Sequence, residues 1–520
     1  MIQDQQLARA VSGIRQRSER QGEIAKVLGA FVDVGILPQL LNDNNQIVYG
    51  RRGTGKTHVL RVLGSRLAEQ PRTTVAYIDA RTLGSTSQFS DPTIPLPARC
   101  LALFRDVLGE FYAPLLEHVV NEPPKDPDKA LKLLDDLANI GLEKTERVER
   151  ETLTDASTKK RADGASASLG TGPTALAAEV HTGREAQETK QATYRVQYDD
   201  KVVFPALHRV LHELLMAAET RLYVLFDEWS SLPPDVQPYL AEFLKRGVLP
   251  IRDVTLKIAS LEYRSRFSLR VSDNYQLGFE LGADVTANQD LDDYYVFDRN
   301  PYAIASAYAD ILYRHLSIEL PPNYLKDKFR VTNGDTLVAS LFTETATFRE
   351  LSRAAEGVVR DLINIFTIAF FHAQRRSRDT IDRKAVIEAA RSWFEQDKAK
   401  FLDDPLHGVL QRIVDEVIGR RRARSFLLPR DLERHPVIQR LFDARVLHQM
   451  QRGYADKDNP GVRYNIYTLD YGTYVDLLGT SKQPDMDLLE PNTPQPDLIV
   501  PFDDKRAIRR IVLPEPVLKV

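Results

Sequence analysis

The chain has 520 residues, which is more than one hydrophobic core usually spans, so we expect two or three separately packed units. Its 70 Lys and Arg residues nearly balance 73 Asp and Glu residues, which gives a formal net charge of -3. No global charge draws the chain to nucleic acid or anionic lipid, so any such binding has to come from a local patch. The single cysteine, Cys100, excludes an internal disulfide, and neither a signal peptide nor a bilayer-spanning apolar run occurs. We expect a cytoplasmic protein with no membrane partner.

Residues 1–25 are expected to form a helical extension, and the stretch IVYGRRGTGKTHVL at 47–60 has the spacing of a phosphate-binding loop. Its glycines let the backbone wrap closely around a phosphate, between a buried strand and a helix. Lys56 would neutralise the outer phosphates of ATP, and the hydroxyl of Thr57 would hold Mg²⁺. The alternative is a glycine-rich turn with a chance lysine. The predicted nucleotide-binding residues are Gly50, Arg51, Arg52, Gly53, Thr54, Gly55, Lys56, Thr57 and His58.

A second buried strand is predicted over Thr73–Ala80, and about 140 residues separate it from the next strand, where a simple core needs only one helix. Apolar residues recur at helical spacing near both ends of this insertion, over 96–119 and 204–218. Residues 121–203 are mostly polar, and small residues alternating over 165–180 predict a weak hairpin. Such a segment fits either a loop that meets a partner or a mobile surface insertion.

The stretch RLYVLFDEWSSLP at 221–233 runs an apolar strand directly into two carboxylates. Asp227 would support the Mg²⁺ shell, and Glu228 would polarise the attacking water. Alone, the pair would fit a surface turn after a core strand, but the phosphate-binding loop favours the catalytic interpretation. A further apolar strand is predicted over Val254–Glu262. Buried strands alternating with helices predict an α/β nucleoside triphosphatase core, with a parallel sheet covered by helices on both faces.

Three downstream stretches resemble the AAA+ ATPases of the origin-recognition-complex and Cdc type. DDYYVFDRNPYAIASAYADILYRHL at 292–316 is similar to the strand, turn and helix that close their ATPase core. AAEGVVRDLINIF at 354–366 is similar to their second-sensor helix, and DTIDRKAVIEAARSWF at 379–394 to the closing helix of their lid. The resemblance implies an ATPase core over 26–300 and a helical lid over 301–400.

The resemblance also implies roles for single residues. Arg360 would reach from the lid to the nucleotide, although an exposed helical arginine is the alternative. Ser260 and Glu262 lie where the family reads the γ-phosphate, usually with Asn, so both are sensor candidates. Arg264 and Arg266 are candidates for the arginine that a neighbouring subunit inserts into the site, with simple salt bridging as the alternative. Because such relatives complete their site with a neighbour's arginine, an ATP-dependent homo-oligomer is implied.

After the lid, residues 401–480 are predicted to form a winged helix, as the resemblance also implies. A helix over Asp404–Ile418 leads to two short helices bounded by Pro429 and Pro436, and then to two returning strands. Arginines of this region are candidates for contacts to the phosphates of duplex DNA, while interspersed acids fit a protein-docking surface equally well. Residues 481–520 are expected to form an extended tail. The DNA-binding candidates are Arg420, Arg421, Arg422, Arg424 and Arg463.

Two functions fit these predictions. The first is an ATPase whose nucleotide-controlled assembly engages DNA through the winged helix. The alternative is a signalling or scaffold ATPase of antiviral defence or of a mobile element, which acts on a protein effector or operon partner. The sequence has no nuclease, protease or deaminase constellation, so an effector activity would belong to that partner.

Overall fold

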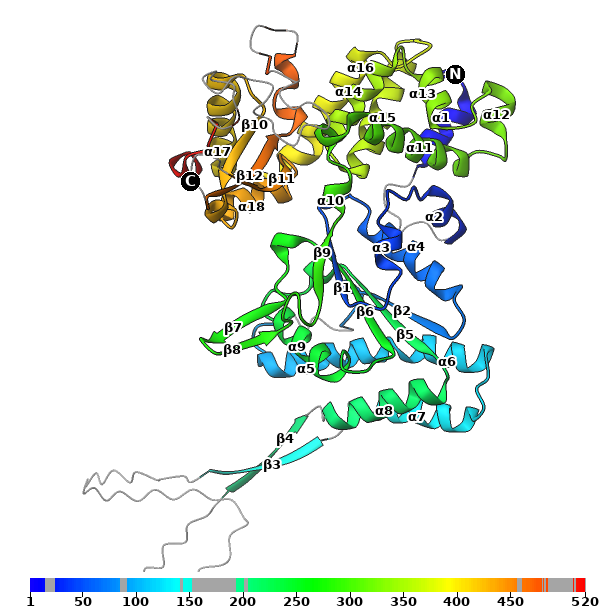
Figure 1. The fold of residues 1–520 in the computed structure, drawn as a ribbon, viewed down its shortest axis with the longest axis vertical. Coiled ribbons are helices and arrows are strands. Elements are labelled where there is room, and N and C mark those ends of the chain that lie inside the picture. The colour runs from blue at the N-terminus through cyan, green and yellow to red at the C-terminus, as the bar shows by residue number, and fades with distance from the viewer. Residues whose placement is uncertain are drawn as a thin grey trace, which may run out of the picture.

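The computed structural model describes residues 1–14, 24–84, 91–140, 144–151, 193–200, 204–455, 461–478, 480, 483–484, 508 and 511–519. These ranges form an α/β core, a helical lid and a C-terminal module that lies beside the lid (Figure 1). No helix of the described ranges is long and apolar enough to cross a membrane.

A five-stranded sheet in the order β2-β5-β6-β1-β9 forms the centre of the core, and its neighbouring strands run parallel. The strands are β1 (Gln46–Tyr49), β2 (Thr73–Asp79), β5 (Arg221–Asp227), β6 (Val254–Ser260) and β9 (Thr286–Asp290). The first four confirm the sequence prediction. The strand expected within 292–297 is wrong, because α10 (Leu291–Tyr294) and a 3-10 turn occupy it. The strand is β9 instead, a polar edge strand that pairs only with β1 and carries little apolar signal.

Helices cover both faces of this sheet, as the sequence predicts. Successive residues of β5 point to opposite faces: Leu225 joins a cluster with Leu60 and Leu63, whereas Val224 joins one with Phe104 and Leu207. The helices of the first cluster are α2 (Ile24–Ala30), α3 (Leu37–Leu40) and α4 (Lys56–Ala68). Those of the second include α5 (Leu96–Gly109), α8 (Phe204–Ala217) and α9 (Gln237–Gly247).

The insertion between β2 and β5 extends from the sheet at the end away from the lid (Figure 1). Helices predicted near its ends are confirmed as α5, α6 (Tyr112–Asn121) and α8. Helix α7 (Pro127–Ile140), within the stretch predicted to be polar, packs against α8 and buries Leu134 and Leu137. An antiparallel hairpin follows, made of β3 (Lys144–Glu151) and β4 (Thr193–Asp200). The hairpin predicted over 165–180 lies outside the described residues.

The lid is built around one large hydrophobic cluster. Its helices are α11 (Pro301–Glu319), α12 (Tyr324–Phe329), α13 (Gly334–Leu341), α14 (Thr345–Ala355), α15 (Val359–Arg375) and α16 (Arg383–Trp393). The N-terminal helix α1 (Gln5–Gly13) belongs to it as well, because Leu7 and Val11 are buried in the cluster with Leu312 and Phe370. Within the predicted N-terminal helical extension, α1 thus packs into the lid, a contact that the sequence did not predict. No periodicity within 1–25 identifies packing partners some 300 positions away.

The C-terminal module combines helices with a three-stranded antiparallel sheet in the order β10-β12-β11. Its elements are α17 (Asp404–Val414), β10 (Ser425–Pro429), α18 (Pro436–Asp443), β11 (Leu447–Ala455) and β12 (Arg463–Leu469). The predicted first helix and returning strands are confirmed. Of the two short helices expected around Pro429 and Pro436, the first is only a 3-10 turn (Arg430–Leu432) and the second is α18, while β10, which was not predicted, precedes both and pairs with β12. The tail docks on the other edge of β10 through a bridge from Leu427 to Val512 and buries Leu513 and Leu518.

Candidate functional site

The glycine-rich loop after β1 touches the lid. Gly53 has a φ of +89°, and a Cβ at this position would lie 2.7 Å from the Cβ of Arg360. The backbone N–H of Arg360 donates to the carbonyl oxygen of Gly53 at 3.0 Å. Only glycine combines this backbone conformation with so close an approach. The loop and the start of α15 are therefore held against each other.

Lys56, the first residue of α4, is folded into the curve of this loop. Its Nζ donates to the carbonyl oxygens of Gly50 at 2.7 Å and of Arg51 at 2.9 Å. Burial lowers the pKa of Lys56, and the negative charges of Glu228 and Asp292 oppose that effect. The loop thus encloses a poorly solvated ammonium group, which favours an anionic ligand nearby.

Two carboxylates lie at the end of β5. The buried Asp227 accepts a hydrogen bond from the hydroxyl of Tyr77 at 2.6 Å and another from the backbone N–H of Glu228 at 2.8 Å. Burial, and then the charge of Asp227, raises the pKa of Tyr77, which keeps this phenol a proton donor. Glu228 adopts a left-handed conformation, with φ 55° and ψ 35°. Such backbone costs about 1 kcal/mol or more for a residue with a side chain, and it often marks functional positions.

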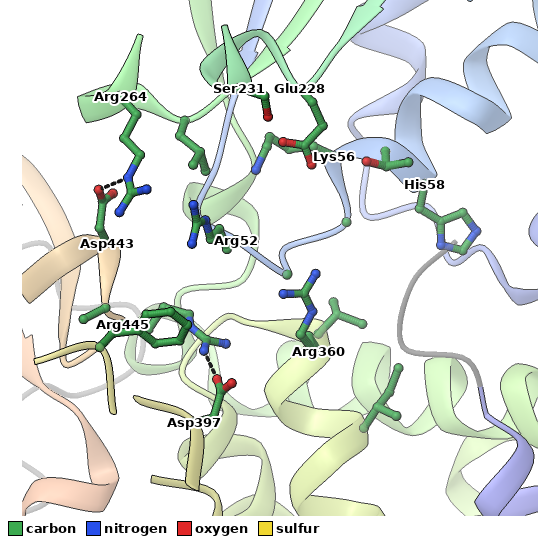
Figure 2. A pocket seen from close by; sticks show the side chains of 18 of the residues that line it. Arg52, Lys56, His58, Glu228, Ser231, Arg264, Arg360, Asp397, Asp443 and Arg445 are labelled. Atoms are coloured by element: carbon green, nitrogen blue, oxygen red, sulfur yellow. Dashed lines mark hydrogen bonds and ion pairs between the residues drawn. The ribbon is translucent and has the colours of Figure 1, made fainter. Parts of the chain in front are cut away.

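One cavity of about 520 Å³ brings these elements together (Figure 2). This volume is within the range of sites for small molecules and cofactors. The loop and α4 contribute Arg52, Gly53, Gly55, Lys56, Thr57 and His58, and the sheet edge contributes Arg81, Glu228 and Arg264. The lid contributes Arg360, and the C-terminal module contributes Arg440, Asp443 and Arg445. Cationic side chains outnumber carboxylates among the residues that line the cavity, so the cavity suits a polyanion.

A smaller and mostly apolar pocket adjoins the cavity beside His58 and His315. The ring of Phe31 meets that of His58 edge to face at 5.4 Å. The ring nitrogen Nε2 of His58 lies 2.7 Å from the carbonyl oxygen of Val27. Burial lowers the pKa of His315 to about 4, so this imidazole is neutral at pH 7. The pocket therefore presents uncharged, partly aromatic surface next to the cationic cavity.

Arg51 was predicted to bind nucleotide, but its side chain turns away from the cavity. Its backbone N–H and its Nε both donate to Asp292 at 2.9 Å. One terminal nitrogen donates to the carbonyl oxygen of Glu356 at 3.0 Å, and the other pairs with the Nδ1 of His448. The guanidinium also stacks over Phe442 at 5.3 Å. The prediction is wrong for this side chain because core, lid and C-terminal module already engage it.

Two other predicted loop residues lie behind the cavity wall. The hydroxyl of Thr54 donates to the carbonyl oxygen of Arg51 at 2.9 Å, and Gly50 accepts from Lys56. Neither residue lines the cavity, but Thr54 lines the smaller adjoining pocket.

Of the three sensor candidates, Arg360 lines the cavity, whereas Ser260 and Glu262 do not. Ser260 is buried, and its hydroxyl pairs with that of Ser265. Glu262 accepts hydrogen bonds from Arg452 at 2.7 and 2.8 Å. These positions give no support to a γ-phosphate sensor at either residue.

The two candidates for a trans-acting arginine differ in position. Arg264 lines the cavity of its own chain, where its Nε donates to Asp443 at 2.5 Å. That pairing does not suit insertion into a neighbour's site. Arg266 is exposed and lies outside the cavity, so its trans role stays a prediction.

The DNA-binding candidates separate into exposed and buried groups. Arg420, Arg422 and Arg463 are exposed, whereas Arg421 is partly buried. Arg424 is buried and pairs with Asp298 and with Glu356. The prediction is wrong for Arg424, since two carboxylates hold it inside the protein and away from any DNA surface.

Several cavity residues were missed in the sequence. Arg81 follows β2 in YIDARTL, and the parallel sheet already places the end of β2 at the same edge as Glu228. The position of Arg81 directly after a predicted parallel strand could therefore have identified it as a cavity residue. No such indication exists for Arg440, Asp443 and Arg445, because only the docking of the C-terminal module brings α18 to the cavity.

The loop after β1, the acidic pair after β5, the parallel sheet and the helical lid define a P-loop nucleotide-binding fold of the AAA+ type. The sequence matches the ORC-CDC6-like family over residues 21–76, a stretch that includes β1, the loop and α4. Over this stretch the chain resembles that family, which confirms the resemblance predicted from the sequence.

Three solved structures are similar over most of their length. Cdc6p from Pyrobaculum aerophilum is 11% identical with a TM-score of 0.31, covering 90% of this chain and 96% of that chain. The ORC2 protein of Aeropyrum pernix in ADPNP-ADP complexes is 12% identical with a TM-score of 0.32 and the same coverage, 90% and 96%. Drosophila ORC bound to DNA is 12% identical with a TM-score of 0.30, covering 91% and 90%. A search of curated proteins found no match.

Proposed function

We propose that this chain binds ATP with Mg²⁺ and hydrolyses it. The observation that carries the proposal is the single cavity lined by the phosphate-binding loop, Glu228 and Arg360. Lys56 and the loop N–H groups would hold the β- and γ-phosphates, and Arg360 would contact them from the lid. The adjoining pocket beside His58 and His315 suits the planar base.

The oxygen donors near the loop fit Mg²⁺. Thr57 lines the cavity, and two hydrogen bonds fix the orientation of the Asp227 carboxylate. Mg²⁺ prefers hard oxygen ligands and usually keeps several waters, so a carboxylate set behind the cavity wall can reach it through one. When bound, the ion supplies charge neutralisation to the phosphates. Glu228 accepts a proton from the attacking water and thereby polarises it.

Two substitutions test this function. Lys56→Ala should abolish ATP binding, because it removes the phosphate counter-charge from the loop. Glu228→Gln should retain ATP binding and lose turnover, because an amide is too weak a base. Glu280→Gln, at an exposed position outside the cavity, is the matched control and should hydrolyse ATP at the wild-type rate. Unaltered hydrolysis by Glu228→Gln would show that the acidic pair is misassigned.

We further propose that nucleotide controls assembly of a homo-oligomer and engagement of duplex DNA by the C-terminal module, acting as a winged helix. The exposed arginines of that module support DNA contact, since they can neutralise phosphates. A DNA titration at several salt concentrations, with and without ATP, tests the proposal. Binding that is absent at every salt concentration would favour the alternative output, a protein effector.

A further inference from the structure

The C-terminal module forms one wall of the cavity that we assign to nucleotide. Helix α18 brings Asp443 to this wall, between the core and the lid. The neighbouring Phe442 ring packs edge to face on Tyr263 of the core at 5.2 Å and lies beneath Arg51 of the loop at 5.3 Å. The position of α18 is therefore fixed against the core by aromatic as well as ionic contacts.

Asp443 places a carboxylate in a cavity that suits a polyanion. Its Oδ2 accepts from the Nε of Arg264 at 2.5 Å, and its side chain is only 15% exposed (Figure 2). Arg52 of the loop lies close enough to interact with both members of the pair. Burial, and then the charge of Arg264, lowers the pKa of Arg52, while Asp443 opposes that shift. One carboxylate thus faces two guanidinium groups inside the cavity.

The other carboxylates near this wall are differently placed. Asp397 of the lid pairs with Arg445 of the module, and Arg440 pairs at 2.6 Å with Asp403 inside the module. Neither of these two ion pairs includes a residue of the core. The ion pair of Arg264 and Asp443 instead joins the core to the module. Of the two partners, Arg264 follows β6 and reaches the cavity from the same sheet edge as Glu228.

The positions of Glu228 and Arg264 determine which side chains the terminal phosphate of a bound nucleotide would meet. The water polarised by Glu228 has to attack that phosphate, so the phosphate has to lie on the Glu228 side of the cavity. Arg264 lines the same side. A nucleoside triphosphate would present charge to Arg264 where Asp443 already does, whereas a diphosphate lacks the phosphate that competes.

We propose that Asp443 sets the preference of this site between nucleoside triphosphate and diphosphate by competing with the terminal phosphate for Arg264. The inference rests on the proposed nucleotide-binding function. In the triphosphate state Arg264 turns to the phosphate, and Asp443 is left beside a like charge. Because linkage is reciprocal, a triphosphate that weakens this contact also loosens the docking of α18 on the core.

Calorimetric titration with ADP and with a non-hydrolysable ATP analogue, both with Mg²⁺, tests the proposal on the full chain. Asp443→Asn removes the charge and keeps a hydrogen-bond acceptor of the same shape. It should bind the ATP analogue on the order of fivefold to tenfold more tightly, with the affinity for ADP unchanged within about twofold. Asp443→Glu keeps the charge and should retain the wild-type ratio. Asp431→Asn, at an exposed position of the same module outside the cavity, is the matched control.

A double-mutant cycle shows whether Asp443 acts through Arg264. Arg264→Ala should weaken binding of the ATP analogue, and adding Asp443→Asn to it should tighten binding less than Asp443→Asn does in the wild type, because only the repulsion between Asp443 and the phosphate is then relieved. Weaker binding of the analogue by Asp443→Asn would overturn the proposal and make Asp443 a ligand of the nucleotide or metal. Equal effects on both nucleotides would also overturn it. A wild-type chain that binds neither nucleotide refutes the proposed function itself, whereas wild-type binding with an unchanged ratio in Asp443→Asn refutes only this inference.

Discussion

Substitution of Gly53 tests the contact between the phosphate-binding loop and the lid, and Gly55 is its matched control. Both glycines have positive φ, +89° and +102°. A Cβ on Gly53 would meet the lid at Arg360, whereas one on Gly55 would have nothing within 4 Å. Gly53→Ala therefore adds a clash with the lid to a backbone strain that both variants share.

The loss of stability has one part that both variants share and one part that only Gly53→Ala suffers. An alanine held in a left-handed conformation costs about 1–2 kcal/mol, and both variants lose that much. In Gly53→Ala the new Cβ and the Cβ of Arg360 would be 2.7 Å apart, and no rotamer change relieves the overlap because the backbone fixes both atoms. Overpacking costs about 1–3 kcal/mol and a weakened hydrogen bond from Arg360 to the loop about 1 kcal/mol. Gly53→Ala should therefore destabilise the lid by about 2–4 kcal/mol more than Gly55→Ala.

Tryptophan fluorescence reports the lid directly. The chain has two tryptophans, and the Nε1 of Trp393 donates to Asp361, the neighbour of Arg360, at 3.1 Å. In a Trp229→Phe background, unfolding by urea without added nucleotide should give a lower lid midpoint for Gly53→Ala than for Gly55→Ala. Equal midpoints would refute the reasoning, because they would mean that the loop does not touch the lid in solution.

Three further predictions concern assembly, DNA and pH. ATP should shift Glu228→Gln to a larger species in light scattering, and an unchanged mass across micromolar concentrations would indicate a monomer. Replacing Arg420, Arg421 and Arg422 by Gln should lower the log–log salt slope of duplex DNA binding by about 0.9 for each lost phosphate contact and leave ATP turnover intact, whereas an unchanged slope would favour protein docking. Burial, and then the charge of Arg51, lowers the pKa of His448 to about 4. The stability that a neutral His448 contributes should therefore be fully present above pH 6.5 and be lost as the pH drops toward 4. His448→Gln should reduce the loss between pH 7 and pH 5, measured by urea unfolding, by about 2 kcal/mol, and an undiminished loss would contradict a buried neutral imidazole.

Local patterns predicted most of the core. The strands β1, β2, β5 and β6 are mostly apolar and buried, bounded by loop residues, and such segments are specified largely by their own side chains. The phosphate-binding loop and the acidic pair were also found, because each is a short motif next to such a strand. In contrast, β9 is polar and exists only because β1 offers it an edge.

The features that the sequence did not predict depend on contacts between segments that are distant in the chain. Nothing near Arg51 in sequence indicates that its guanidinium meets Asp292, Glu356 and His448. Likewise, the basic run after α17 reads as one surface, although Arg424 at its end is inside the protein. The positions of whole modules decide both cases, and periodicity within a segment does not report them.

The place of α1 has a consequence for how the chain folds during synthesis. Its apolar residues Leu7 and Val11 are made before the core, but their partners in α11 and α15 lie about 300 to 360 positions later. At about 5–20 residues per second, this helix waits from roughly 15 s to more than a minute before its binding surface leaves the ribosome. The core, whose contacts close sooner, can form in that interval. We therefore expect the lid to become native after the core, and the apolar face of α1 to stay accessible to chaperones until α11 and α15 have been made.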